Sequence, residues 1–138
     1  MNAKDLIKES ERMALIDLEA MKEHADSRAL FYECLKRYII HRFLIDDGFW
    51  DDDLLALARH SIALTKKRTG GDTGLSDLGI NCAGASSATT KHLLLIISLK
   101  RGLGIEIDPD EVASATKAAQ LADLLRGALT AKQHAITA

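Results

Sequence analysis

The chain has 138 residues, enough to bury one sizeable hydrophobic core but not two full domains. Its 18 lysines and arginines nearly balance 20 aspartates and glutamates, and the net charge of -2 gives no basic field for nucleic acid or an anionic membrane. Two cysteines, Cys34 and Cys82, are too few for a disulfide framework and form no Cys-x-x-Cys pair, so we expect a cytoplasmic protein.

Helix-favouring residues dominate the sequence and no strand is long enough to found a sheet, so we predict an all-α fold. The first predicted helix covers residues 3–23, where apolar residues recur at three- and four-residue steps along one face: Leu6, Met13, Ile16 and Ala20. The second begins at a cap formed by Asp26-Ser27 and continues to about residue 45. Together they form a predicted helical hairpin over residues 1–48.

A turn at residues 46–48 leads into the third predicted helix, which is capped by Asp51 and continues to about residue 67. Trp50 and Leu55 have the spacing of a hydrophobic staple across its first turn. The neighbouring acids lack the alternation and the terminal glutamate of a calcium loop, so we expect caps and no metal site: Asp46, Asp47, Asp51, Asp52 and Asp53. A long glycine-rich loop follows over residues 69–85.

The fourth predicted helix covers residues 87–103 and is apolar on nearly every side, which places it in the middle of the bundle. Its apolar run, residues 93–97, is too short to cross a membrane, and we expect no membrane insertion. Pro109 starts a short helical turn, and Thr116 is the predicted cap of a last helix. This helix has a clean apolar stripe: Ala118, Leu121, Ala122, Leu125 and Leu129. We expect residues 132–138 to form a frayed tail.

Reactive side chains show no arrangement typical of a catalytic site. The glycines have neither the spacing of a P-loop nor a preceding strand. No two histidines lie four residues apart, as zinc ligands on one helix face would: His24, His41, His60, His92 and His134. A nucleophilic Cys82 would need a nearby base such as His92. We therefore expect no catalytic residues and a protein that is not an enzyme.

Two motifs precede the fourth helix. Asp77-Leu78-Gly79 ends the long loop, and after an insertion of residues 80–83 the chain continues with Gly84-Ala85-Ser86-Ser87-Ala88. Taken alone, serines at a helix start are ordinary caps. After the helix come Gly104-Ile105-Glu106-Ile107-Asp108-Pro109 and then Ala115-Thr116-Lys117. Over about residues 51–129 this order of motifs resembles the acyl carrier protein family, and the part after the fourth helix is the more specific half.

The resemblance implies a four-helix carrier bundle over residues 51–131, to which the hairpin of residues 1–48 is added. It also implies that Ser87, with Ser86 as the fallback, carries 4'-phosphopantetheine. The implied function is to carry acyl or aminoacyl groups as thioesters in a dedicated biosynthetic pathway. The implied partners are a phosphopantetheinyl transferase and the enzymes that load the acyl or aminoacyl group.

The chain also departs from the family pattern. Ser86 replaces an aspartate and Ala88 replaces a leucine, and counting back from residues 105–107 without a gap puts Thr89 at the attachment position. The family's central helix is acidic, whereas the predicted partner-facing residues here are basic: Lys91, His92, Lys100 and Arg101. These departures leave an alternative, a non-modified helical interaction or regulatory module derived from the carrier fold.

Aromatic residues are concentrated before the carrier-like region. Phe31, Tyr38, Phe43, Phe49 and Trp50 are all of the aromatic residues except Tyr32. Two helices of about 20 residues each have too little core to be stable alone. We therefore expect the hairpin to pack against the carrier-like helices.

Overall fold

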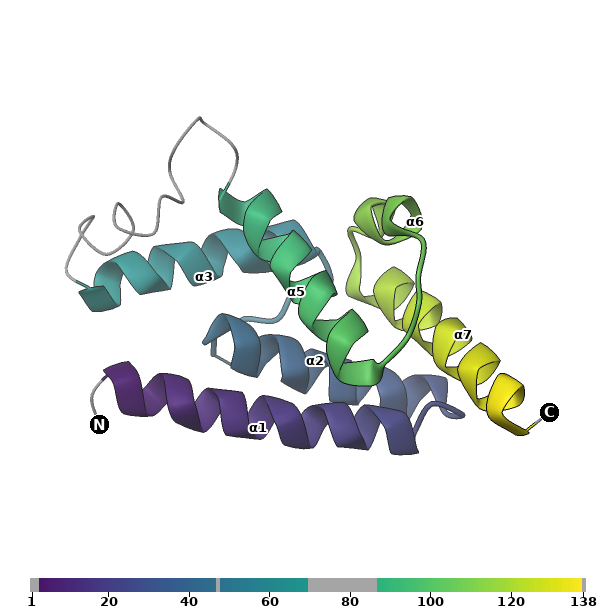
Figure 1. The fold of residues 1–138 in the computed structure, drawn as a ribbon. Helices are drawn as coiled ribbons and strands as arrows, with labels where there is room; N and C mark the ends of the chain where they lie inside the picture. The colour runs from purple at the N-terminus through teal and green to yellow at the C-terminus, as the bar shows by residue number, and fades with distance from the viewer. Residues whose placement is uncertain (1–2, 47, 70–86, 138) are drawn as a thin grey trace.

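The computed structural model describes residues 3–46, 48–69 and 87–137, and within these ranges the chain forms six α-helices and no strand (Figure 1). The helices are α1 (Ala3–Glu23), α2 (Arg28–Phe43), α3 (Leu54–Thr69), α5 (Ser87–Leu103), α6 (Pro109–Ser114) and α7 (Ala118–Thr137). The predicted all-α fold and helical bundle are confirmed. None of these helices has the length and hydropathy needed to span a bilayer.

The central helix is α2, and not α5 as the sequence predicted. Among the described helices, α2 packs against α1, α3 and α7. Its buried side chains face several directions: Phe31, Cys34, Leu35, Tyr38, Ile39, Ile40 and Phe43. The side chains of α5 that were expected inside the bundle divide between the core and solvent. Leu95 and Ile96 are buried, whereas Leu93, Leu94 and Ile97 are 45%, 57% and 45% exposed.

The hairpin of α1 and α2 shares one core with the helices that follow it. Phe31 and Leu35 of α2 are fully buried in the same cluster as Leu99 of α5 and Leu121 of α7. The helices α2 and α7 pack against each other. The expectation that the hairpin packs against the later helices is therefore confirmed, and α2 supplies the surface against which α7 packs.

Polar bonds also join α2 to its neighbours. The hydroxyl groups of Tyr38 and Ser98 lie 2.7 Å apart, which links α2 to α5 inside the bundle. Ser98 also donates a hydrogen bond to the Leu95 carbonyl at 2.8 Å, so in this pair Tyr38 is the donor. The guanidinium of Arg28 contacts both carboxylate oxygens of Asp123 at 3.1 Å, between the exposed edges of α2 and α7.

Asp52 is the hydrogen-bonding centre that fixes the start of α7. Its backbone carbonyl accepts a bond from Ala118 N–H at 2.7 Å, and its carboxylate accepts one from Ala119 N–H at 3.1 Å. The same carboxylate oxygen accepts the Tyr32 hydroxyl at 2.8 Å, and the indole N–H of Trp50 donates to that hydroxyl at 3.1 Å. Burial, followed by the bond to Asp52, raises the pKa of Tyr32 to about 12.

Two predicted caps are corrected by these contacts. Thr116 does not act as the cap of α7 through its side chain, because Asp52 accepts the first free N–H groups of that helix. The cap of α3 is Asp53 and not Asp51, since its carboxylate accepts bonds from the backbone N–H groups of Leu55 and Ala56 at 3.0 and 3.3 Å. A helix N-terminus leaves such groups unpaired, and an acceptor from a distant segment satisfies them as well as a local one.

Other helix ends follow local signals. Ser27 caps α2 as predicted, its hydroxyl accepting the Leu30 N–H at 3.3 Å, and Asp108 caps α6 in front of Pro109. The last helix, however, continues to Thr137, beyond the point where fraying was expected.

Gly104 ends α5 with a backbone conformation that favours glycine. Its φ is +64°, and the bonds from Gly104 N–H to Arg101 O and from Ile105 N–H to Lys100 O form a Schellman motif. We expect Gly104→Ala to lower the free energy of unfolding by about 1 kcal/mol, because alanine is strained in the left-handed region.

Gly104→Asn is the matched control for this substitution, since asparagine tolerates a positive φ better than alanine does. Denaturant unfolding of the two variants measures the difference. Two results would contradict strain from the positive φ as the cause. One is a Gly104→Ala variant as stable as the wild type, and the other is a Gly104→Asn variant that is less stable than Gly104→Ala.

Candidate functional site

The candidate attachment residue, Ser87, is the first residue of the 17-residue helix α5. Free N–H groups and the helix dipole make such a position favourable for an anion. Thr89, the residue chosen by the alternative register, is exposed two positions further on. The fallback Ser86 and the loop motifs of residues 77–85 lie outside the described residues.

His92 lies on the buried side of α5, away from any partner. It is 4% exposed, and its Nε2 atom lies 3.2 Å from the carbonyl oxygen of Ala115, in the connection between α6 and α7. Burial lowers the pKa of His92, and the bond to Ala115 and the charge of Asp53 oppose this shift. The neutral ring donating from Nε2 to the carbonyl is therefore a structural link. The expectation that His92 faces a partner does not fit this position.

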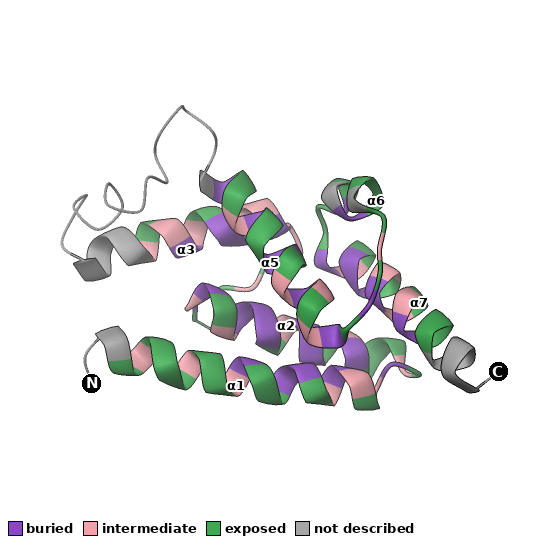
Figure 2. Ribbon diagram, in the orientation of Figure 1, coloured by how far each residue is buried: buried purple, intermediate pink, exposed green. Residues whose placement is uncertain are grey.

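The exposed side of α5 combines apolar and basic residues. Leu93, Leu94 and Ile97 stand in its centre, and Figure 2 shows exposed residues recurring along this helix. Lys100 and Arg101 follow in the last turn, where Lys100 Nζ lies 3.6 Å from an exposed Glu106 carboxylate. The sequence of α5 contains no acidic residue. Such a surface suits contact with another molecule, since soluble proteins seldom cluster exposed leucine and isoleucine without a reason.

Lys91 extends toward α2, at the edge of this exposed side. Its ammonium nitrogen lies 5.4 Å from the centre of the Phe43 ring, a cation–π contact. Burial, and then the nearby charge of Arg42, lowers the pKa of Lys91. The two cations and three apolar side chains line a pocket of about 110 Å³: Arg42, Phe43, Lys91, Leu94 and Leu95. The sequence did not predict this meeting of α2 and α5.

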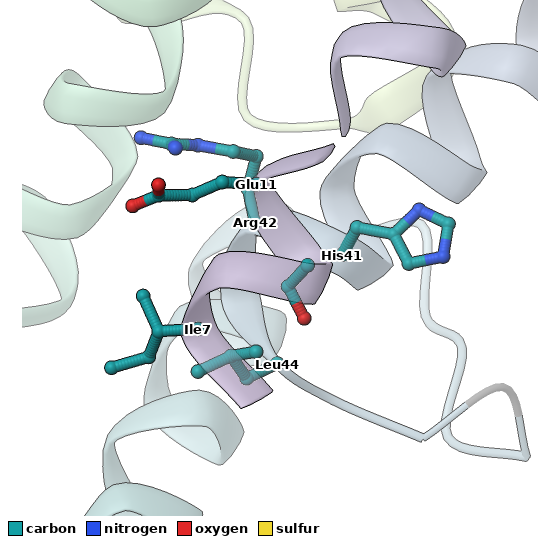
Figure 3. Close-up of a pocket in the computed structure, with 6 residues that line it drawn as sticks. Ile7, Glu11, His41, Arg42 and Leu44 are labelled. Carbon is teal, nitrogen blue, oxygen red and sulfur yellow. The ribbon is translucent and has the colours of Figure 1, made fainter. Parts of the chain in front are cut away.

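Arg42 also lines a second pocket, of about 250 Å³, between α1 and α2 (Figure 3). Its lining residues are Ile7, Ser10, Glu11, His41, Arg42 and Leu44. At this site His41 Nδ1 lies 2.6 Å from a carboxylate oxygen of buried Asp17, which ties α2 to α1. Glu11 extends from α1 toward the same side of the pocket as Arg42, but the two side chains form no ion pair.

The described residues form exposed surfaces and small pockets. Within the ranges that the structure describes, no three His, Cys, Asp or Glu side chains are grouped to hold a metal ion. Comparison of the chain with protein-family models, curated proteins and solved structures finds no match. A functional interpretation therefore depends on the residues and the geometry of this chain.

Proposed function

We propose that the protein is a carrier of acyl or aminoacyl groups, held as thioesters on a 4'-phosphopantetheine arm attached to Ser87. The observation that carries the proposal is the position of Ser87 at the start of α5. A phosphodiester at that position would meet the positive end of a long helix, where an anion is stabilised. When bound, the arm supplies the thiol that forms the thioester.

The order of helices around Ser87 supports the same proposal. A helix before the loop, a long helix after it, a six-residue helix and a final long helix follow the sequence pattern that resembles carrier proteins. The short helix α6 begins with Asp108 as its cap and Pro109 in its first turn. This Asp-Pro pair is one of the motifs on which the resemblance to carrier proteins rests. The difference lies in α2, which occupies the centre of this bundle.

The proposed partners are a phosphopantetheinyl transferase and the enzymes that load the group. Both would contact α5 near Ser87, and the exposed leucines with Lys100 and Arg101 provide the contact surface. Because α5 has no acidic residue, we expect partners with acidic docking surfaces. A dedicated biosynthetic pathway accounts for such a reversed charge pattern.

Co-expression with a broad-specificity phosphopantetheinyl transferase tests the proposal. We expect the intact mass to increase by one phosphopantetheine, because Ser87 is the first residue of α5. Ser87→Ala should abolish the addition, whereas Ser86→Ala should only slow it. Thr89→Ala is the matched control and should be modified like the wild type.

The two remaining outcomes separate the alternatives. Modification that survives in Ser87→Ala but not in Ser86→Ala would move the attachment site by one residue. A wholly unmodified protein, under conditions that load a control carrier, would contradict carrier function for this chain.

A second candidate function is a non-modified interaction or regulatory module. The exposed Leu93, Leu94 and Ile97 favour it, because they provide a contact surface that needs no prosthetic group. An unmodified protein in the mass experiment would leave this candidate as the better interpretation.

A further inference from the structure

Arg42 of α2 and Lys91 of α5 bring two positive charges to one pocket, although 48 residues lie between them in the sequence. Lys91 is half-buried, with its ammonium group over the Phe43 ring. Like charges that face one another repel, and removing a lysine from water costs free energy. The fold holds them together in spite of both costs.

No acidic side chain among the described residues forms an ion pair with Arg42 or Lys91. Glu11 lines the neighbouring pocket together with Arg42 but forms no ion pair with it. Lys100 of α5, by contrast, does pair with an acid, Glu106, which lies just beyond the C-terminal end of the helix. Within the described part of the chain, neither cation of this pocket therefore has a carboxylate at ion-pair distance.

The floor of the pocket is apolar. Phe43, Leu94 and Leu95 line it beside the two cations, and Leu94 continues the apolar surface toward Ile97 on the exposed side of α5. An arginine binds oxyanions through its planar fork of donors, and a lysine binds them as a point charge. A short apolar group attached to the oxyanion would lie against the leucines.

We propose that the pocket between α2 and α5 binds an oxyanion, a phosphate or a carboxylate, joined to a short apolar group. Arg42 and Lys91 bind the oxyanion, and Phe43, Leu94 and Leu95 contact the apolar group. The anion has two possible sources of the same chemistry. One is the phosphodiester of an arm on Ser87, one helical turn before Lys91, and this source rests on the proposed function. The other is a free amphiphilic anion.

Octyl phosphate is the probe, and unmodified full-length protein is titrated with it by calorimetry and by NMR. We expect binding that shifts the resonances of Phe43, Leu94 and Leu95. Octanol, which lacks the charge, should bind at least about tenfold more weakly. Arg42→Gln and Lys91→Met should each weaken octyl phosphate binding by about tenfold or more, because each loses a charge-assisted contact.

Arg101→Gln is the matched control, since Arg101 is an exposed cation on the same helix outside the pocket. Its affinity for octyl phosphate should stay within about twofold of the wild type. Ser87→Ala should also bind like the wild type, which separates this proposal from the attachment of an arm. Weaker binding by phosphopantetheinylated protein would identify the arm as the anion source, and equal binding would identify a free anion.

Three results would overturn the proposal. These are equal affinity for octanol and octyl phosphate, an equal loss of affinity in Arg101→Gln, or resonance shifts in the wild type confined to residues outside the pocket. The melting temperature of each variant without ligand, compared with that of the wild type, shows whether the variant is folded. Relief of repulsion should leave Arg42→Gln and Lys91→Met melting no lower than the wild type.

Discussion

A chain that begins at Phe49 is expected to lose cooperative folding. It retains α3, α5, α6 and α7 but lacks α2, against which α3 and α7 pack. Without α2, apolar side chains that are fully buried in the whole protein, including Leu57, Leu99 and Leu121, lose part of their cover. Thermal unfolding followed by circular dichroism should show a broad, non-cooperative transition or aggregation.

A single substitution in α2 tests the same point within the full-length chain. Phe31→Ala should lower the free energy of unfolding by about 3–5 kcal/mol, because it leaves a cavity in the core. Leu30→Ala is the control, since the neighbouring side chain is half exposed, and it should change stability much less. Cooperative unfolding of the chain from Phe49 at the temperature of the whole protein would show that the hairpin is a separate arm.

Asp52→Ala is expected to lower the free energy of unfolding by about 2–4 kcal/mol. The carboxylate accepts hydrogen bonds from Tyr32 and from the first turn of α7, and each bond to a charged group contributes about 1.5–3 kcal/mol, less at partly exposed positions. Its loss leaves the Ala119 N–H and the Tyr32 hydroxyl without this acceptor. Denaturant unfolding at neutral pH measures the change.

Three further variants separate the contributions at Asp52. Asp52→Asn keeps an acceptor oxygen and should lose less stability than Asp52→Ala. Tyr32→Phe should remove the hydroxyl bond to Asp52 and the bond from the Trp50 indole, about 1–2 kcal/mol together. A double-mutant cycle between the two positions gives their coupling. Asp46→Ala is the control, because Asp46 is exposed in the preceding turn. Equal effects at Asp46 and Asp52 would show that net charge and not the hydrogen bonds stabilises α7.

Local signals in the sequence locate most helix ends correctly. Ser27 caps α2, Pro109 starts α6 and Gly104 follows the end of α5, since each effect depends on backbone groups within a few residues. The cap of α7 was predicted wrongly because its acceptor, Asp52, comes from a segment more than 60 residues earlier. No local pattern contains that information.

Burial of α5 shows the limit of apolar composition as a guide to position. The many leucines and isoleucines of α5 predicted a central position for this helix. Its outer side is instead exposed to solvent, because α2 occupies the centre of the bundle. The meeting of Arg42 and Lys91 was likewise missed. Arg42 is exposed at the end of α2, and nothing in the spacing of its neighbours indicates that it shares a pocket with a residue of α5.

The central position of α2 also has a consequence for how the chain folds. α1 and α2 are joined by a short turn, so their packing needs only local search and should be fast. The contact between α2 and α7 joins residues as far apart as Arg28 and Asp123, 95 positions along the chain. Closing so large a loop costs conformational entropy before the contact contributes any favourable free energy. We therefore expect the docking of α7 on the preformed hairpin, and not the formation of the hairpin, to limit the folding rate.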